Sequence, residues 1–178
     1  MAWRGNDFAA AAARKGHPVI LAPCSHFYFD YYQSSAPTEP KAIGSLIPLM
    51  QVYGYELPAL SPEEASKVRG LQANIWTEYL YDMGLVEYMA WPRMCAIAES
   101  GWSEADKDWD FFTRRLERHF RVLDLLGVKA CRNFFCPYIE FHPDTAHDKV
   151  VTISADLPDS EIRYTLDGSE PGPQSPLY

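Results

Sequence analysis

The sequence predicts an α/β protein followed by a smaller antiparallel β module. Over residues 1–136, helical patterns alternate with short apolar runs, an order typical of parallel sheets with crossover helices. Over residues 137–178, the pattern changes to β-branched and alternating segments. A chain of 178 residues has room for one domain or slightly more. We therefore expect a boundary between residues 136 and 137.

The first predicted helix covers residues 7–16, with Asp7 as the expected N-cap and Gly16 after its basic last turn. Residues 17–23 form a short apolar run bounded by glycine and proline, which favours a strand buried on both faces. Residues 25–60 are rich in aromatic residues and proline. A connection of this length is usually functional or contains short elements of its own.

The second helix–strand pair begins at Ser61, an expected N-cap that is followed by Pro62 at the first helical position. Residues 71–76 then alternate between apolar and polar side chains, as in a strand. Two helices are predicted over residues 92–101 and 109–127. Because two strands cannot form an independent sheet with covered faces, we expect this part to be a slice of a larger sheet.

The C-terminal module contains two expected strands, residues 149–154 and 161–166, and a tight turn at Asp167–Gly168. The chain stops at Tyr178 after these two strands. We therefore expect a β domain that is cut short.

The charge balance argues against several classes of partner. The chain has 16 Lys and Arg against 24 Asp and Glu, a net charge of −8, whereas binding nucleic acid or an anionic membrane needs clustered cations. No run of 18 apolar residues predicts a membrane span, and residues 1–7 lack the apolar stretch of a signal peptide. The four cysteines are too few for a disulfide scaffold and too scattered for a zinc site.

Two short segments are the best functional candidates. Tyr28 and Asp30 follow the first predicted strand, and Trp76 and Glu78 end the second. In extended backbone, residues two apart point the same way, so each segment presents an aromatic ring beside a carboxylate. This pair suits a sugar, whose apolar face lies on the ring while the carboxylate accepts hydroxyl hydrogen bonds. The alternative is that the rings belong to the core and the acids are solvated.

These residues belong to an ordered series of motifs that resembles glycoside hydrolase family 20, the β-N-acetylhexosaminidases. The resemblance covers nearly the whole chain, and the collinear set is much more specific than any one motif. Its pieces are Trp3, residues 16–20 (GHPVI), 28–33 (YFDYYQ), 70–78 (GLQANIWTE), 88–93 (YMAWPR), 98–99 (AE), 102–103 (WS) and, in the β module, 162–171 (IRYTLDGSEP).

The resemblance implies the last strands and helices of a (β/α)₈ TIM barrel, followed by the start of a small antiparallel β-sandwich. It also implies a retaining, substrate-assisted mechanism, in which the 2-acetamido oxygen of the substrate attacks the anomeric carbon. By position, Tyr28 matches the tyrosine that hydrogen-bonds this acetamido oxygen. Trp3 and Trp76 match tryptophans that wall the acetamido pocket, and Asp30 and Glu78 match carboxylates that bind sugar hydroxyls.

One departure from the family pattern is large. The general-acid Glu and its Asp partner lie in a His-x-Gly-Gly-x-Asp-Glu segment, and this chain contains no Asp-Glu dipeptide. The upstream arginine that binds sugar hydroxyls also has no counterpart. A further pocket tryptophan is missing, and we expect Tyr53 or Tyr55 to fill its place. We therefore expect the chain alone to be inactive, with the N-terminal half of the barrel as its missing partner.

Two other residues are expected to be structural. Arg93 follows Pro92 at a helix start, where it is expected to pair with Glu87 or Glu99. His26 is more simply explained as a packed loop histidine than as a group that faces the cleft.

The resemblance thus implies a fragment of an exo-acting enzyme whose partner is a glycan with a terminal N-acetylhexosamine. Neither a metal nor an organic cofactor is expected, and the parent is expected to be exported to the periplasm or the medium. The alternative is a non-catalytic carbohydrate-binding or structural protein on the same scaffold, in which the absence of the acid pair is real.

Overall fold

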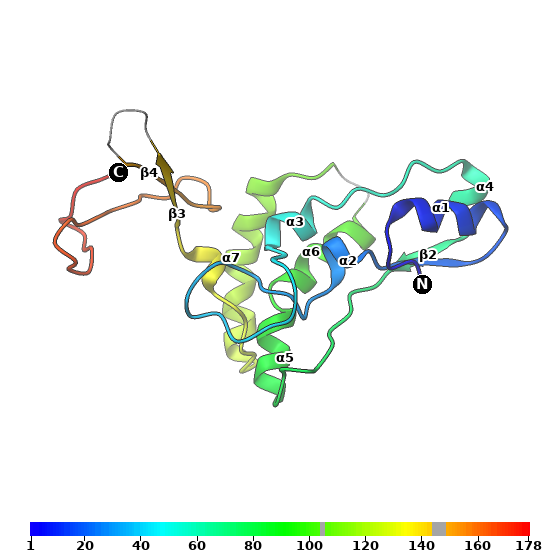
Figure 1. The fold of residues 1–178 in the computed structure, drawn as a ribbon, viewed down its shortest axis with the longest axis horizontal. Coiled ribbons are helices and arrows are strands. Elements are labelled where there is room, and N and C mark those ends of the chain that lie inside the picture. Colours follow the sequence, from blue (N-terminus) through cyan, green and yellow to red (C-terminus); the bar gives the residue numbers. More distant parts are fainter. Residues whose placement is uncertain (104–105, 144–148) are drawn as a thin grey trace. The chain divides into compact units, whose positions relative to one another are not determined.

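The computed structural model describes residues 1–103, 106–143 and 149–178, which form two compact units, Met1–Asn133 and Phe134–Tyr178 (Figure 1). Each unit is described by itself. Among the described residues, no helix combines the length and the apolar character that crossing a bilayer requires.

The sheet of the first unit is parallel, as predicted. Strand β1 (Val19–Leu21) pairs with β2 (Val68–Leu71), and the register shifts by one residue between Val19 and Ile20. Ala2 forms a parallel bridge to Leu21 on the other side of β1. Three segments therefore lie side by side with their carboxyl ends at the same edge. In parallel α/β sheets, this is the edge where ligands bind.

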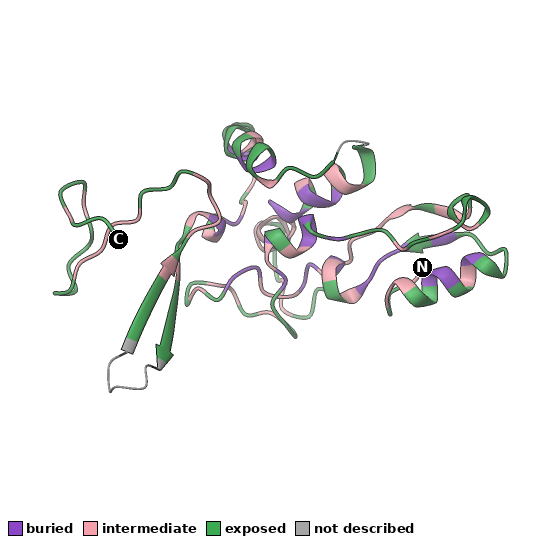
Figure 2. Ribbon diagram, turned by 90° about the horizontal axis from the view of Figure 1, so that it is seen from above, coloured by how far each residue is buried: buried purple, intermediate pink, exposed green. Residues whose placement is uncertain are grey.

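Helix α1 (Asn6–Arg14) lies against this sheet and buries an alanine face, shown in purple in Figure 2. Ala9 and Ala13 pack on Val19 and Leu21 in one hydrophobic cluster. The helix is confirmed, but its N-cap is Gly5 and not Asp7, and no side chain caps it. Small residues on this face allow the helix to approach the strand closely.

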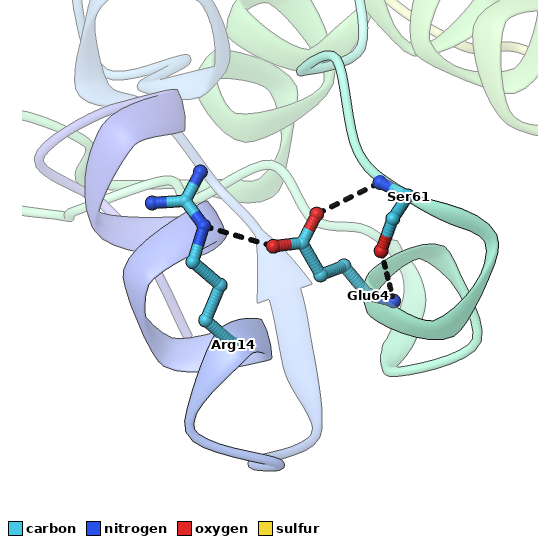
Figure 3. A network of polar contacts seen from close by, with 3 residues as sticks. All are labelled: Arg14, Ser61 and Glu64. Atoms are coloured by element: carbon cyan, nitrogen blue, oxygen red, sulfur yellow. Dashed lines mark hydrogen bonds and ion pairs between the residues drawn. The ribbon is translucent and has the colours of Figure 1, made fainter.

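The connection from β1 to β2 contains three short helices, α2 (Cys24–Phe27), α3 (Leu49–Tyr53) and α4 (Pro62–Ala65). The N-cap predicted at Ser61 is confirmed as a capping box (Figure 3). The Glu64 amide donates to Ser61 Oγ over 3.3 Å, and the Glu64 carboxylate accepts from the Ser61 amide over 2.7 Å. The same carboxylate accepts from Arg14 Nε over 2.8 Å, which ties α4 to α1.

Three longer helices follow β2: α5 (Met83–Ala90), α6 (Arg93–Trp102) and α7 (Trp109–Leu125). The predictions for α6 and α7 are confirmed, and α7 buries the expected stripe of apolar side chains, Phe112, Leu116, Phe120 and Leu123. Helix α5 was not predicted. Its start is marked by Asp82, whose side chain accepts a hydrogen bond from the Leu85 amide over 2.9 Å.

The structural role predicted for Arg93 holds, but its predicted partners are wrong. Glu99 pairs with Arg115, and Glu87 accepts from the Lys129 amide. Arg93 is completely buried and donates only to main-chain carbonyl oxygens among its described hydrogen bonds. The physical reason is that its side chain reaches the carbonyls of Phe29, Tyr31 and Ile47, which accept no main-chain hydrogen bond among the described residues and so need another donor.

A 3₁₀ turn (Asn133–Phe135) spans the boundary between the units, and the second unit contains the antiparallel strands β3 (Tyr138–Pro143) and β4 (Lys149–Ser154). The strand predicted over residues 149–154 is confirmed. A continuous strand over residues 161–166 is wrong: only Arg163 forms a bridge, to Leu177. Apolar side chains of the hairpin are exposed, such as Ile139 at 57% and Phe141 at 68% (Figure 2).

Candidate active site

The site begins at a turn just beyond α2. Tyr28 pairs with Asn74 in a parallel bridge, in which the Phe29 amide donates to the Asn74 carbonyl over 2.7 Å and the Asn74 amide donates to the Phe27 carbonyl over 2.8 Å. This bridge continues the parallel arrangement of β1 and β2 beyond the regular strands. It places the turn Tyr28–Tyr31 beside the segment that leads to Trp76.

The extended conformation expected for residues 28–30 holds at Tyr28 and is wrong for Phe29 and Asp30, which form a turn. The Tyr31 amide donates to the Tyr28 carbonyl over 3.2 Å and closes a turn. The turn buries Phe29 completely while the Tyr28 ring stays half-buried. The regular strand β2 likewise ends at Leu71, and Trp76 lies in the segment after it. The candidate residues therefore come from loops at the carboxyl edge of the sheet.

Tyr28 and Trp76 lie next to each other at this edge. Their ring centroids are 6.5 Å apart with an interplanar angle of 50°, and half of the Trp76 surface is exposed. Tyr31 lies on the other side of Tyr28, 5.9 Å from ring to ring. Burial and the nearby Cys24 raise the pKa of the Tyr28 phenol, whereas its hydrogen bond with the Trp76 side chain lowers it. The net effect is upward, so Tyr28 is a neutral hydrogen-bond donor at neutral pH.

Asp30 is almost completely buried, with 3% of its surface exposed. Burial raises the pKa of its carboxyl, and the charge of Glu78 raises it further. Main-chain hydrogen bonds at Asp30 and Trp76 and the charge of Arg93 act in the opposite direction. Among the described residues, Asp30 Oδ1 has no hydrogen-bond partner. A buried carboxylate oxygen without a partner is costly, and a ligand hydroxyl would satisfy it.

Trp3 and Glu78 are the two remaining candidates, and both are exposed. Trp3 follows the bridged residue Ala2, and its carbonyl accepts from the Cys24 amide over 2.8 Å. Its ring is 44% exposed and is covered by the Arg4 guanidinium, 5.0 Å from the ring centroid. Glu78 is exposed, and its link to the site is electrostatic, through its effect on Asp30. The structure thus brings Tyr28, Asp30 and Trp76 together directly and leaves Trp3 in contact with Arg4.

Two tyrosines expected to line the pocket lie elsewhere. Tyr53 is buried and stacks on Phe112 at 4.5 Å, so it belongs to the core between α3 and α7. Tyr55 is also buried, and it packs on Phe27 at 4.7 Å. The expectation that one of them replaces the missing tryptophan is wrong, because both rings are buried against phenylalanine side chains of the core.

His26 is packed, as predicted, but it lies in α2 and not in a loop. Its ring lies 5.2 Å from that of Tyr55, and its Nδ1 is 2.8 Å from Ser25 Oγ. Burial lowers its pKa, so the neutral ring is favoured.

Asn74 is a residue of this edge that was not predicted as part of the site. Its Oδ1 accepts from Gln72 Nε2 over 2.8 Å, and its Nδ2 has no partner among the described residues. The available signal was the alternation of residues 71–76, which places Gln72, Asn74 and Trp76 on one face.

Family models match both parts of the chain. Residues 1–105 match the catalytic domain of glycosyl hydrolase family 20, and residues 144–178 match the chitobiase/beta-hexosaminidase C-terminal domain. The catalytic match lies within the first unit and includes all five candidate residues.

Similar proteins carry consistent descriptions. A beta-hexosaminidase from Porphyromonas gingivalis is 39% identical over 189 residues, which cover 100% of this chain and 24% of that protein. A beta-N-acetylhexosaminidase from Cellulomonas fimi is 33% identical over 124 residues, which cover 67% of this chain and 24% of that protein. The chain therefore spans about a quarter of the length of these relatives.

Solved structures agree with the sequence matches. The exo beta-N-acetylglucosaminidase of Vibrio harveyi, determined with N-acetylglucosamine, is 34% identical with a TM-score of 0.68 and covers 73% of this chain and 21% of its own. The beta-N-acetylhexosaminidase of Streptomyces coelicolor is 32% identical with a TM-score of 0.60, and the match covers 69% of this chain and 25% of the Streptomyces chain. These neighbours identify the first unit as a fragment of a TIM barrel. The chain belongs to glycoside hydrolase family 20.

Proposed function

We propose that this chain is part of an exo-acting β-N-acetylhexosaminidase, which releases terminal β-linked N-acetylglucosamine or N-acetylgalactosamine from glycans. The observation that carries this proposal is the meeting of Tyr28, Asp30 and Trp76 at the carboxyl edge of parallel strands. In TIM barrels, binding and catalytic groups come from this edge. The names of the relatives and the sugar bound by the Vibrio harveyi enzyme support the same substrate class.

Tyr28 would act directly in the reaction. In the proposed mechanism, the 2-acetamido oxygen of the substrate attacks the anomeric carbon, and the bond from that carbon to the leaving oxygen breaks. The sugar and its acetamido group then form a cyclic oxazolinium ion. A neutral phenol at Tyr28 donates a hydrogen bond to that acetamido group and holds it in the attacking position. The contact belongs to the reacting group, so it acts on the chemical step as well as on binding.

The other four residues would bind the sugar. The exposed ring of Trp76 offers an apolar surface to one face of the pyranose, and Trp3 extends the wall on the neighbouring segment. Asp30 Oδ1, which lacks a partner among the described residues, would accept from a ring hydroxyl. Glu78 would bind a second hydroxyl from the outer side. No metal or organic cofactor takes part in this scheme.

The chain by itself would be inactive. It contains no Asp-Glu dipeptide, and in the proposed mechanism such a pair supplies the general acid and the carboxylate that orients the acetamido nitrogen. Loss of a general acid alone removes about 10²- to 10⁴-fold in rate. We infer that the acid pair belongs to an upstream part of the barrel, since the chain spans about a quarter of its relatives.

A non-catalytic carbohydrate-binding or structural protein on the same scaffold is the second candidate. The observation that favours it is the absence of the acid pair. The upstream coding sequence distinguishes the two: an in-frame His-x-Gly-Gly-x-Asp-Glu segment supports the enzyme, and its absence supports the binding protein.

The direct test uses 4-nitrophenyl N-acetyl-β-glucosaminide with two preparations, this chain alone and the full-length protein that contains it. We expect hydrolysis by the full-length protein, with the β-anomer as the first product in NMR spectra, and none by the chain alone. Substrates with one, two or three fluorines on the acetamido methyl test the mechanism. Their kcat should fall stepwise because fluorine weakens the attacking oxygen. Inactive full-length protein, or equal rates for all substrates, would contradict the proposal.

A further inference from the structure

Arg93, the first residue of α6, is completely buried, with 0% of its surface exposed. Among the described residues it forms no ion pair, although a buried charge without compensation is strongly destabilising. Its compensation is a set of hydrogen bonds to main-chain carbonyl oxygens. The position of those carbonyls points to what Arg93 does.

The guanidinium connects three segments of the first unit. Nη2 donates to the Phe29 carbonyl over 2.5 Å, and Nη1 donates to the Tyr31 carbonyl over 3.0 Å and the Ile47 carbonyl over 3.1 Å. Nε and Nη2 also donate to the Met89 carbonyl at the end of α5, over 3.2 and 2.7 Å. Two of these acceptors, Phe29 and Tyr31, lie immediately before and after Asp30.

The ring of Phe29 adds a contact to the same turn. The Arg93 guanidinium lies 4.7 Å from the centroid of this fully buried ring. A planar fork with five N–H groups can bond several carbonyls while it stacks on an aromatic face, and a lysine ammonium cannot reproduce both contacts. The turn is thus held from its main chain and from its central apolar side chain.

The charge of Arg93 also acts on the site. It lowers the pKa of the Asp30 carboxyl, against the larger effect of burial and the effect of Glu78. The charges that face Arg93 in turn include Glu39 and Asp30. Arg93 therefore lies behind the candidate site, where it contacts the backbone that carries the site residues and no solvent.

We propose that Arg93 is a positioning residue that holds the Tyr28–Tyr31 turn, and with it the Tyr28 phenol and the Asp30 carboxylate, against the sugar. This inference rests on the proposed function and adds a residue to it. Arg93 does not touch the substrate in this account. It acts through the carbonyls of Phe29 and Tyr31, which fix the direction of the Asp30 side chain between them.

A purely structural role for Arg93 makes a different prediction. If Arg93 only joined α5, α6 and the turn, its loss would lower the amount of folded protein and leave the folded fraction with normal selectivity. If Arg93 positions Asp30, its loss would weaken the recognition of one sugar hydroxyl in every folded molecule. The ratio of kcat/KM for two substrates on one preparation separates these cases, because the concentration of active protein cancels.

The experiment uses the full-length protein with 4-nitrophenyl N-acetyl-β-glucosaminide and its 4-deoxy and 6-deoxy analogues. A hydrogen bond to a charged group contributes about 10- to 100-fold, so the wild type should prefer the parent sugar over one analogue by about this factor. We expect Asp30→Asn to lose most of this preference. Arg93→Lys and Arg93→Gln should each reduce it at least about fivefold, since a displacement of about 1 Å strongly weakens a directed contact.

Arg115→Lys is the matched control, because Arg115 bonds to Glu99 between α6 and α7 and has no contact with the turn among the described residues. Its preference should stay within about twofold of the wild type. In Arg93→Lys combined with Asp30→Asn, the preference should be no lower than in Asp30→Asn alone, since both changes remove the same contact.

The outcomes distinguish a failure of the proposed function from a failure of the positioning role of Arg93. An inactive wild type would overturn the proposed function, and this inference with it. An active wild type whose preference is unchanged in Arg93→Lys and Arg93→Gln would overturn the positioning role alone. Failure of both variants to yield folded protein, while Arg115→Lys folds normally, would assign Arg93 to folding and would also overturn it.

Discussion

Asp30 combines two properties that oppose each other at the scale of a single residue. Its carboxyl is almost completely buried, and burial together with Glu78 raises its pKa. The same carboxylate has an oxygen without a partner among the described residues, which would be available to a sugar hydroxyl. A residue of this kind supports binding while it lowers the stability of the free protein.

Replacement of Asp30 by Asn should therefore stabilise the free protein at neutral pH. The pKa of Asp30 in the folded protein lies above the ordinary value of 3.8. The protonated carboxyl therefore stabilises the folded state fully below pH 3.8, and this stabilisation is lost as the pH rises through the folded-state pKa. The melting temperature of Asp30→Asn should exceed that of the wild type at pH 7, and the difference should shrink as the pH falls towards 4. Scanning calorimetry of the full-length protein at several pH values measures it.

The control for this prediction is Glu117→Gln, which removes an exposed carboxylate on α7 and should change the melting temperature little. A lower melting temperature for Asp30→Asn at pH 7 would show that the ionised carboxylate stabilises the free protein. The account of Asp30 as a binding group held at the expense of stability would then be wrong.

The pairs Tyr28–Asp30 and Trp76–Glu78 are visible in the sequence and remain predictions as site residues, whereas the contacts of Arg93 cannot be read from the sequence. Glu87 and Glu99 lie six residues before and after Arg93, which makes an ion pair a natural expectation. The real partners are the nearby Met89 carbonyl and the carbonyls of Phe29, Tyr31 and Ile47, which are far from Arg93 in the sequence. Only the tertiary fold brings the three distant carbonyls to one point.

At the scale of elements, the start of α4 was predicted better than the length of β2. The capping box of α4 depends on Ser61 and Glu64 alone, and it forms as the sequence indicates (Figure 3). The alternation of residues 71–76 predicted a strand, but β2 covers Val68–Leu71 and only Asn74 pairs beyond it. The partner segment turns at Tyr28–Tyr31, so it offers no continuous edge for a longer ladder.

Ser61→Ala should destabilise α4 by about 1 kcal/mol, because the amide at the third helical position loses its acceptor. Hydrogen exchange of the Glu64 amide is the local measurement, and it should become about fivefold faster. Ser66→Ala is the matched control at the C-cap of the same helix, since Ser66 Oγ donates to the Glu63 carbonyl and caps no amide. Equal protection of Glu64 in both variants would contradict the capping role.

At the scale of the whole molecule, the order of elements predicted a parallel α/β part followed by antiparallel strands, and the described sheets have these two kinds of pairing. The β module was predicted less well, because pairing over residues 161–166 is limited to the bridge from Arg163 to Leu177. Apolar residues of β3 and β4 remain exposed, as Figure 2 shows in green. The hairpin of β3 and β4 has only two strands and cannot bury both of its faces. Without a larger sheet to join, the alternating residues 161–166 do not form a longer ladder.

The chain also spans about a quarter of the length of its relatives, and we propose that its candidate site binds the sugar while an upstream part supplies the acid pair. The central claim is that the Tyr28–Tyr31 turn and Trp76 form part of the sugar site of the complete enzyme. Tyr28 carries the most specific role in this claim, because it is the one described residue that would contact the reacting group.

The most direct measurement is the steady-state kinetics of Tyr28→Phe in the full-length protein, with Tyr31→Phe on the same turn as the control. Removal of a hydrogen-bond donor that acts in the transition state lowers kcat by about 10²- to 10³-fold. We expect a loss of this size for Tyr28→Phe with KM changed less than about threefold, and kcat within about twofold of the wild type for Tyr31→Phe. A kcat near that of the wild type in Tyr28→Phe, or equal losses in the two variants, would contradict the account.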